Sequence, residues 1–158
     1  MEQIKINSGI YQCEIVDENN RVLGILAFNP VDFNLPDRLS KGWKNIQNCL
    51  EQARDTISKH TEELEALKDD TVEIDNKDME TLAGVIADID RDIKEQLDYI
   101  FDADLSSVFG NTHLATPTKT GFLIENLMNA LMPVIEREIK KANANSQAKK
   151  SKYTKRYQ

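Results

Sequence analysis

The chain of 158 residues contains few of the residue patterns that mark enzymes or disulfide-stabilised domains. Its six glycines are dispersed, so it has no glycine-rich loop of the kind that holds a phosphate group. Its two cysteines, Cys13 and Cys49, have neither CxxC nor Cys/His spacing, and we expect free thiols in a reducing compartment. Serine, cysteine and histidine occur in no nucleophile motif. The sequence therefore predicts a protein that is not an enzyme.

Long hydrophobic runs are missing as well. No stretch approaches the roughly 20 apolar residues that a membrane-spanning helix needs, and the first residues do not resemble a signal peptide. The two histidines, His60 and His113, lie in unrelated parts of the chain and suggest no metal site. The run Asp-Ile-Asp-Arg-Asp at 88–92 lacks the glycine of a calcium loop, and we interpret it as a solvated helix face with internal Asp–Arg pairs. We expect no metal, no cofactor and no contact with a membrane.

Acidic residues are missing from the C-terminal end. Residues 140–158 contain seven Lys or Arg and no Asp or Glu, and since the whole chain carries −7, residues 1–139 carry −14. So polar a segment cannot form a core, and we predict a flexible basic tail over 144–158. The candidate partner-binding residues in this tail are Lys149, Lys150, Lys152, Tyr153, Lys155, Arg156 and Tyr157.

The tail has three possible roles. Its mixture of basic and aromatic residues suits an acidic protein partner, and it equally suits nucleic acid through base stacking and phosphate contacts. It could also be a solvated end without a partner. The strongly acidic remainder of the chain would repel a nucleic-acid backbone, so we favour the protein partner.

The start of the chain alternates apolar and polar residues in the manner of β-strands. Ile4 and Ile6 alternate with polar neighbours, and alternation resumes in 11–16 and 21–28, on the two sides of an Asp-Glu-Asn-Asn turn. We predict a three-stranded antiparallel β-meander over about 3–28, with helices covering one of its faces.

Helical periodicity dominates the rest of the sequence. We predict helices over about 36–68, 76–101 and 121–143, the first two forming an antiparallel hairpin. The connection from 102 to 120 is expected to be irregular. The first helix has an unbroken stripe with spacings of four and three, made of Leu39, Trp43, Ile46, Leu50, Ala53, Ile57, His60, Leu64 and Leu67. The prediction is a single α+β domain over 1–143.

The stripe allows two interpretations. Trp43, Ile46, Leu50 and Ile57 either pack against the chain's own second helix and sheet, or part of the stripe binds a helix of another protein. Burial is the simpler interpretation. Under the second interpretation, these residues would form the surface that binds the partner protein, here called the client surface.

The order of several short motifs resembles the tail assembly chaperones of long-tailed phages and prophages of Gram-positive bacteria. The resemblance covers nearly the whole chain, although segment 102–105 departs from the pattern expected between Phe101 and Val108. The motifs are Leu26-Ala27-Phe28-Asn29-Pro30-x-Asp32, Arg38, Tyr99-Ile100-Phe101-Asp102, Val108-Phe109-Gly110, Phe122-Leu123 opening a helix that contains Pro133, and the closing Lys152-Tyr153-Thr154-Lys155-Arg156-Tyr157.

The resemblance implies a role in phage assembly without catalysis. Such proteins bind the long, helical tape measure protein, keep it soluble and help recruit tail-tube subunits. They act in the host cytoplasm and are absent from the mature virion. Self-association would fit an acidic body with a basic end. The alternatives are a structural component of the phage tail or capsid, and a small nucleic-acid-binding or regulatory phage protein.

Overall fold

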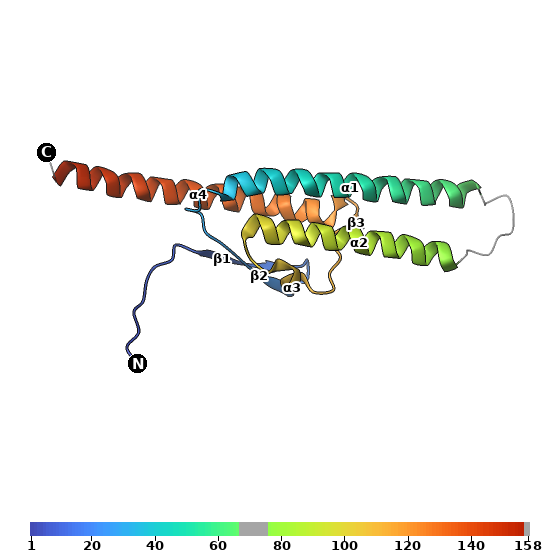
Figure 1. Cartoon of the computed structure of the whole chain (residues 1–158), viewed down its shortest axis with the longest axis horizontal. Coiled ribbons are helices and arrows are strands. Elements are labelled where there is room, and N and C mark those ends of the chain that lie inside the picture. The colour runs from blue at the N-terminus through green and yellow to red at the C-terminus, as the bar shows by residue number, and fades with distance from the viewer. Residues whose placement is uncertain (67–75, 157–158) are drawn as a thin grey trace.

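Three long helices and a β-hairpin make up most of the structure, a computed structural model (Figure 1). It describes residues 1–66 and 76–156, and for 63–66, 76–78, 106 and 146–156 it describes the backbone alone. In chain order the elements are β1 (Tyr11–Val16), β2 (Val22–Phe28), α1 (Leu35–Ala66), α2 (Asn76–Phe101), α3 (Leu105–Phe109), β3 (Pro117–Thr118), β4 (Gly121–Phe122) and α4 (Leu123–Arg156). The predicted α+β class is confirmed.

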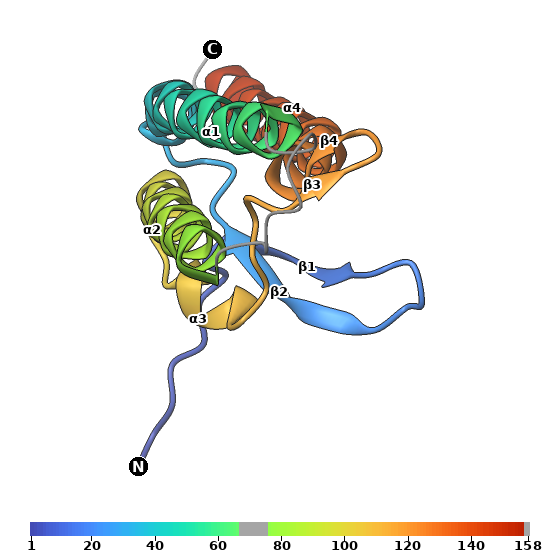
Figure 2. The same ribbon diagram turned by 90° about the vertical axis from the view of Figure 1, so that its right-hand side faces the viewer.

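Helices α1 and α2 run antiparallel and side by side along most of their length (Figures 1 and 2). Their bounds agree with the predicted helices, and the link at 67–75 lies outside the described residues. At one point the two helices approach closely. A Cβ atom built on Gly42 of α1 would lie 2.3 Å from Cγ1 of Ile100 in α2, so only glycine fits there without a shift of its neighbours.

The hydrophobic core lies where α1, α2, α4 and the β-hairpin meet. Every one of these elements contributes side chains that are almost completely removed from solvent, which explains why the helices carry apolar faces at a spacing of three and four residues. The fully buried large side chains are Leu26, Leu35, Ile46, Leu50, Ile93, Leu97, Ile100, Leu114, Ile124 and Ile135.

The N-terminal sheet has two strands, and the predicted third strand is wrong. β1 pairs antiparallel with β2 alone, from Tyr11 opposite Phe28 to Val16 opposite Val22. Before β1, the side-chain oxygen of Asn7 accepts a hydrogen bond of 3.0 Å from the backbone N–H of Gly9, whose φ of 72° favours glycine. This turn directs the preceding residues away from β1, so their alternation finds no partner strand.

The connection from 102 to 120 contains structure that the sequence did not predict. The Asp98 carboxylate accepts a hydrogen bond of 2.6 Å from the N–H of Leu105, and Asp104 accepts one of 3.2 Å from the N–H of Ser107. Together these carboxylates satisfy backbone donors at the start of the short helix α3. Further along, β3 and β4 form a small second hairpin immediately before α4.

Helix α4 begins with a cap and continues farther than predicted. The Glu125 carboxylate accepts the N–H of Phe122 at 3.1 Å, and the carbonyls of Leu114 and Thr116 accept the next two N–H groups at 2.9 Å each. The helix continues through Pro133 to Arg156, and its end projects beyond the start of α1 (Figure 1).

The predicted helix end near 143 is therefore wrong. After Pro133 the sequence has no further proline and no glycine, and its lysines, alanines and glutamine favour helix without any core contact. The flexibility of segment 144–158 stays a prediction. The side chains proposed to bind a partner, from Lys149 to Tyr157, lie outside those that the structure describes.

Membrane insertion through a helix is also tested by the structure. Among the described residues, no helix combines the length and the apolar character that crossing a bilayer requires.

Candidate functional site

The heptad stripe of α1 has two different environments in the structure. Ile46 and Leu50 are 0% and 1% exposed and belong to the core, so the client interpretation fails for these two residues. Trp43 and Ile57, in contrast, are half-buried. Leu39 is half-buried too, and Leu64 and Leu67 lie outside the described side chains. The stripe is thus closed in its middle and partly open at its start.

The open start of the stripe forms one wall of a groove between α1 and α4, here named the α1–α4 groove. Its volume is about 430 Å³. Met128 and Ile135 of α4 form its floor and are 2% and 1% exposed. The residues that line it are Pro36, Leu39, Ser40, Trp43, Met128, Asn129, Met132, Ile135, Glu136 and Ile139.

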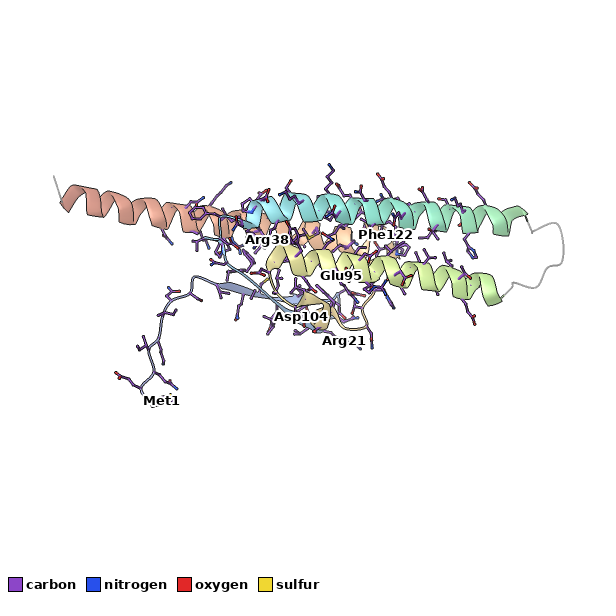
Figure 3. All side chains as sticks on the ribbon, in the orientation of Figure 1. Met1, Arg21, Arg38, Glu95, Asp104 and Phe122 are labelled. Carbon is purple, nitrogen blue, oxygen red and sulfur yellow. The ribbon has the colours of Figure 1, made fainter. Side chains whose placement is uncertain are left out.

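A clamp at the start of α1 holds one wall of the groove in place. Arg38 lies at this end of the helix (Figure 3). Its Nε donates a hydrogen bond of 3.1 Å to the carbonyl of Ile100, and its Nη2 lies 2.7 Å from Oδ2 of Asp32. The other Asp32 oxygen accepts the N–H of Asn34 at 2.9 Å. The Arg38 bond, followed by the Asn34 bond, lowers the pKa of Asp32, so the clamp stays charged at neutral pH.

Farther along α1, a second polar contact fixes this helix to α4. The Nη2 atom of Arg54 lies 2.9 Å from Oε1 of Glu125, and its guanidinium carbon lies 5.2 Å from the centre of the Phe122 ring. The pair is exposed, so its contribution to stability is small. It joins α1 to the first turn of α4.

The chemistry of the groove suits an apolar helix better than a small polar ligand. Tryptophan, leucine, isoleucine and two methionines provide most of its lining, with Glu136 the only charged member. Methionine side chains are flexible and polarizable, and they adapt to partners of varied shape. A groove between two helices with this lining can accept the apolar face of a third helix.

A polar cluster on α2 corrects the interpretation of 88–92 as a solvated face. Asp90 is 4% exposed, and its Oδ2 lies 2.9 Å from Nζ of Lys94. Its Oδ1 accepts the N–H of Leu114 at 2.5 Å, while Lys94 donates to the carbonyl of Gly110 at 2.9 Å. These bonds tie the loop before β3 to α2. The cluster therefore has a structural role.

Other parts of the same run behave as expected. Arg91 and Asp88 are exposed and form the predicted pair, with Nη2 and Oδ1 3.3 Å apart. His113, which is largely exposed, has its Nδ1 3.4 Å from Oδ2 of Asp90. Within the described part of the chain, no three His, Cys, Asp or Glu side chains are placed to hold a metal ion.

Both cysteines are free thiols in the structure. Partial burial raises the pKa of Cys13 and of Cys49, so both are expected to stay protonated at neutral pH. A protonated, half-buried thiol is a poor nucleophile. Neither cysteine therefore adds reactive chemistry to the site.

Sequence reasoning identified one wall of the groove and missed the other. Trp43 was a candidate, but Met128, Met132 and Ile139 were not. They follow the spacing of an ordinary amphipathic helix, and no signal in the sequence says which helix packs beside them.

Comparison with known proteins does not identify a family for this chain. No family model, no curated protein and no solved structure matches it.

Proposed function

We propose that this protein is a tail assembly chaperone, which binds the tape measure protein of a long-tailed phage, keeps it soluble and helps recruit tail-tube subunits. The observation that carries the proposal is the α1–α4 groove, a mainly apolar groove between two helices. In this account the groove accepts the apolar face of a tape measure helix. The order of motifs along the chain supports the same assignment.

Exposed apolar surface next to the groove also supports a protein client. Phe33, two residues before α1, is 97% exposed, and Val31 is 49% exposed. Single exposed apolar side chains are common on monomers, whereas several beside an apolar groove are typical of a binding surface. They extend the apolar surface beyond the start of α1, where a long client helix would continue.

The C-terminal basic segment supplies the second part of the proposal. Residues 140–158, with seven Lys or Arg and no Asp or Glu, suit an acidic surface such as one on a tail-tube subunit. Contacts of this kind weaken with salt, because exposed charges are screened over about 10 Å at 0.1 M ionic strength. Client binding in the groove is mainly apolar and should be far less sensitive to salt.

The proposal is tested by expressing the protein together with the tape measure protein and measuring how much of the client stays soluble. Ser40 lies on the rim of the groove and is exposed, so Ser40→Arg fills the groove without disturbing the core. We expect this variant to lose most of the client from the soluble fraction.

Ser58→Arg is the matched control. Ser58 is an exposed serine on the same helix, 18 residues farther along, which is five turns, so it points in the same direction but lies about 27 Å from Ser40. We expect Ser58→Arg to protect the client as the unchanged protein does. Loss of protection in both variants, or in neither, would contradict the assignment of the groove.

Mass spectrometry of purified particles separates the proposal from a structural role in the tail. A chaperone should be absent from the finished particle, whereas a structural component would be present in fixed proportion to the other tail proteins.

A further inference from the structure

The N-terminal arm, residues 1–10, extends away from the helices, with Met1 at its far end (Figures 1 and 3). Ile4, Ile6 and Ile10 are 88%, 83% and 53% exposed. In the part of the chain that the structure describes, the arm forms hydrogen bonds only within the local turn at 7–10. Ile4 and Ile6 would occupy one face of a strand and Lys5 the other. The arm therefore has the pattern of a strand and no strand beside it.

A strand edge without a partner lies elsewhere in the molecule. β1 pairs only with β2 among the described residues, so its outer edge retains free backbone donors and acceptors. This edge borders a second groove of about 450 Å³, here named the β1–α4 groove. Residues 13–18 line it together with Leu23 of β2, and since consecutive strand residues point to opposite faces, we infer that the groove follows the edge of β1.

The opposite wall of the β1–α4 groove is apolar. Leu123, Leu127, Leu131 and Val134 of α4 line it, and Ile15 of β1 faces them across the groove. Its volume falls in the range of about 300–1,000 Å³ that is usual for binding pockets. An added strand would thus find backbone partners on one side and apolar side chains on the other, the combination that strand addition requires.

We propose that the arm of a second copy of this chain adds as a strand to the free edge of β1, with Ile4 and Ile6 in the β1–α4 groove. Alternation places these two side chains in the row of Cys13 and Ile15, on the face that turns toward the helices. Lys5 then falls in the outer row with Glu14, which is exposed and of opposite charge. Two copies that exchange arms in this way form a closed, symmetric dimer.

The arm of the same chain fits the groove less well. Folding back through a two-residue loop at Ser8-Gly9 would place Ile6 opposite Tyr11 and Ile4 opposite Cys13. The Tyr11 hydroxyl already accepts a hydrogen bond of 3.2 Å from Nη2 of Arg137, so Ile6 would lie beside a charged group and short of the groove. The arm of a second copy is not held in the register that places Ile6 opposite Tyr11. Its isoleucines can therefore reach the apolar wall of the β1–α4 groove.

Sedimentation of the purified full chain at increasing concentration is the first test. We expect a dimer that dissociates on dilution, and a monomer at every concentration after removal of residues 1–6. The double variant Ile4→Gln and Ile6→Gln keeps the arm and should lose the dimer as well. A full chain that stays monomeric, or a dimer that survives removal of the arm, would overturn the proposal.

Disulfide trapping between two differently tagged copies locates the contact. One copy carries Ile4→Cys or Ile6→Cys in a background of Cys13→Ser and Cys49→Ser, and the other keeps Cys13 as its only cysteine. We expect mild oxidation to link the two copies for at least one arm position. Lys5→Cys, on the other face of the arm, is the matched control and should link much less. No link between copies, or equal linking by Lys5→Cys, would overturn the exchange.

A chain that carries both an arm cysteine and Cys13 tests the remaining arrangement. If the bond forms within single chains at a concentration where the protein sediments as a monomer, the arm folds back on its own strand and the exchange is wrong. These outcomes do not depend on the tape measure protein, so the inference and the proposed function can fail separately.

Discussion

The middle and the start of α1 carry the same heptad pattern but bury it to different extents. In the middle, Ile46 and Leu50 are almost completely removed from solvent. At the start, Leu39 and Trp43 are half-buried and line the groove that separates α1 from α4. The comparison shows that one periodic stripe can hold a fold together along part of its length and remain available to a partner along the rest. Periodicity records which face is apolar, and the neighbouring elements decide how much of it is covered.

The same charge placed in both regions of α1 should affect stability very differently. Leu50→Asp puts a carboxylate into the core, and we expect it to lower the free energy of unfolding by about 3–5 kcal/mol. Leu39→Asp puts the same group on the groove wall, where water reaches it, and should cost about 1 kcal/mol. Chemical denaturation of both variants measures the difference. Equal losses would mean that the groove wall is core as well.

Glycine substitutions probe the contact between α1 and α2 next to the groove. Gly42→Ala forces a methyl group to within 2.3 Å of the Ile100 side chain, and we expect a net loss of about 1–2 kcal/mol after the gain in helix propensity. Gly84→Ala is the control on α2, where an added Cβ meets nothing within 4 Å. It should stabilise the protein by about 0.5–1 kcal/mol. Thermal unfolding of the two variants should therefore shift in opposite directions.

Because of the clamp between Asp32 and Arg38 at the start of α1, the stability of the fold should decrease in acid. Because the pKa of Asp32 in the folded protein lies below its ordinary value of 3.8, the ionised carboxylate stabilises the fold at higher pH. That contribution is lost as the pH falls from the ordinary value through the lowered pKa. Asp32→Asn should be less stable than the unchanged protein at pH 7, and the gap should narrow below about pH 4. A gap that stays constant with pH would exclude this role of the carboxylate.

The C-terminal segment should contribute least to stability. Removing residues 145–158 should leave the melting temperature nearly unchanged, because the segment has no apolar face to bury. The same truncation should weaken binding to an acidic partner, and added salt should weaken binding by the full chain in a similar way. A large drop in melting temperature would show that the segment packs against the rest of the protein.

Sequence reasoning succeeded where burial follows a simple period. The bounds of α1 and α2 could be predicted because their apolar residues repeat every three or four positions over many turns. The absence of a third strand could not be predicted, because the alternation of Ile4 and Ile6 does not show whether a neighbouring strand is available to pair with them. The turn at 7–9 directs residues 1–6 away from β1, so they form no third strand.

The candidate site was less accessible to prediction for a related reason. Asp90 looks like a surface residue in a charged run, and its partners at Gly110 and Leu114 are backbone groups that no side-chain pattern reveals. Likewise, Trp43 stood out as the single tryptophan, but the groove exists only because α4 lies beside α1. Contacts between distant segments depend on how the segments pack, and the spacing of apolar residues within one segment does not predict its packing partner.

The most direct measurement uses Trp43, the one tryptophan of the chain, as a reporter inside the groove. A helical peptide from the tape measure protein that lacks tryptophan is titrated into the purified protein while its fluorescence is recorded. We predict a saturable shift of the Trp43 emission to shorter wavelength, because the client removes the half-buried indole from water. Ser40→Arg should weaken the titration and Ser58→Arg should leave it unchanged. A peptide that binds by an independent assay without changing the emission of Trp43 would contradict the account.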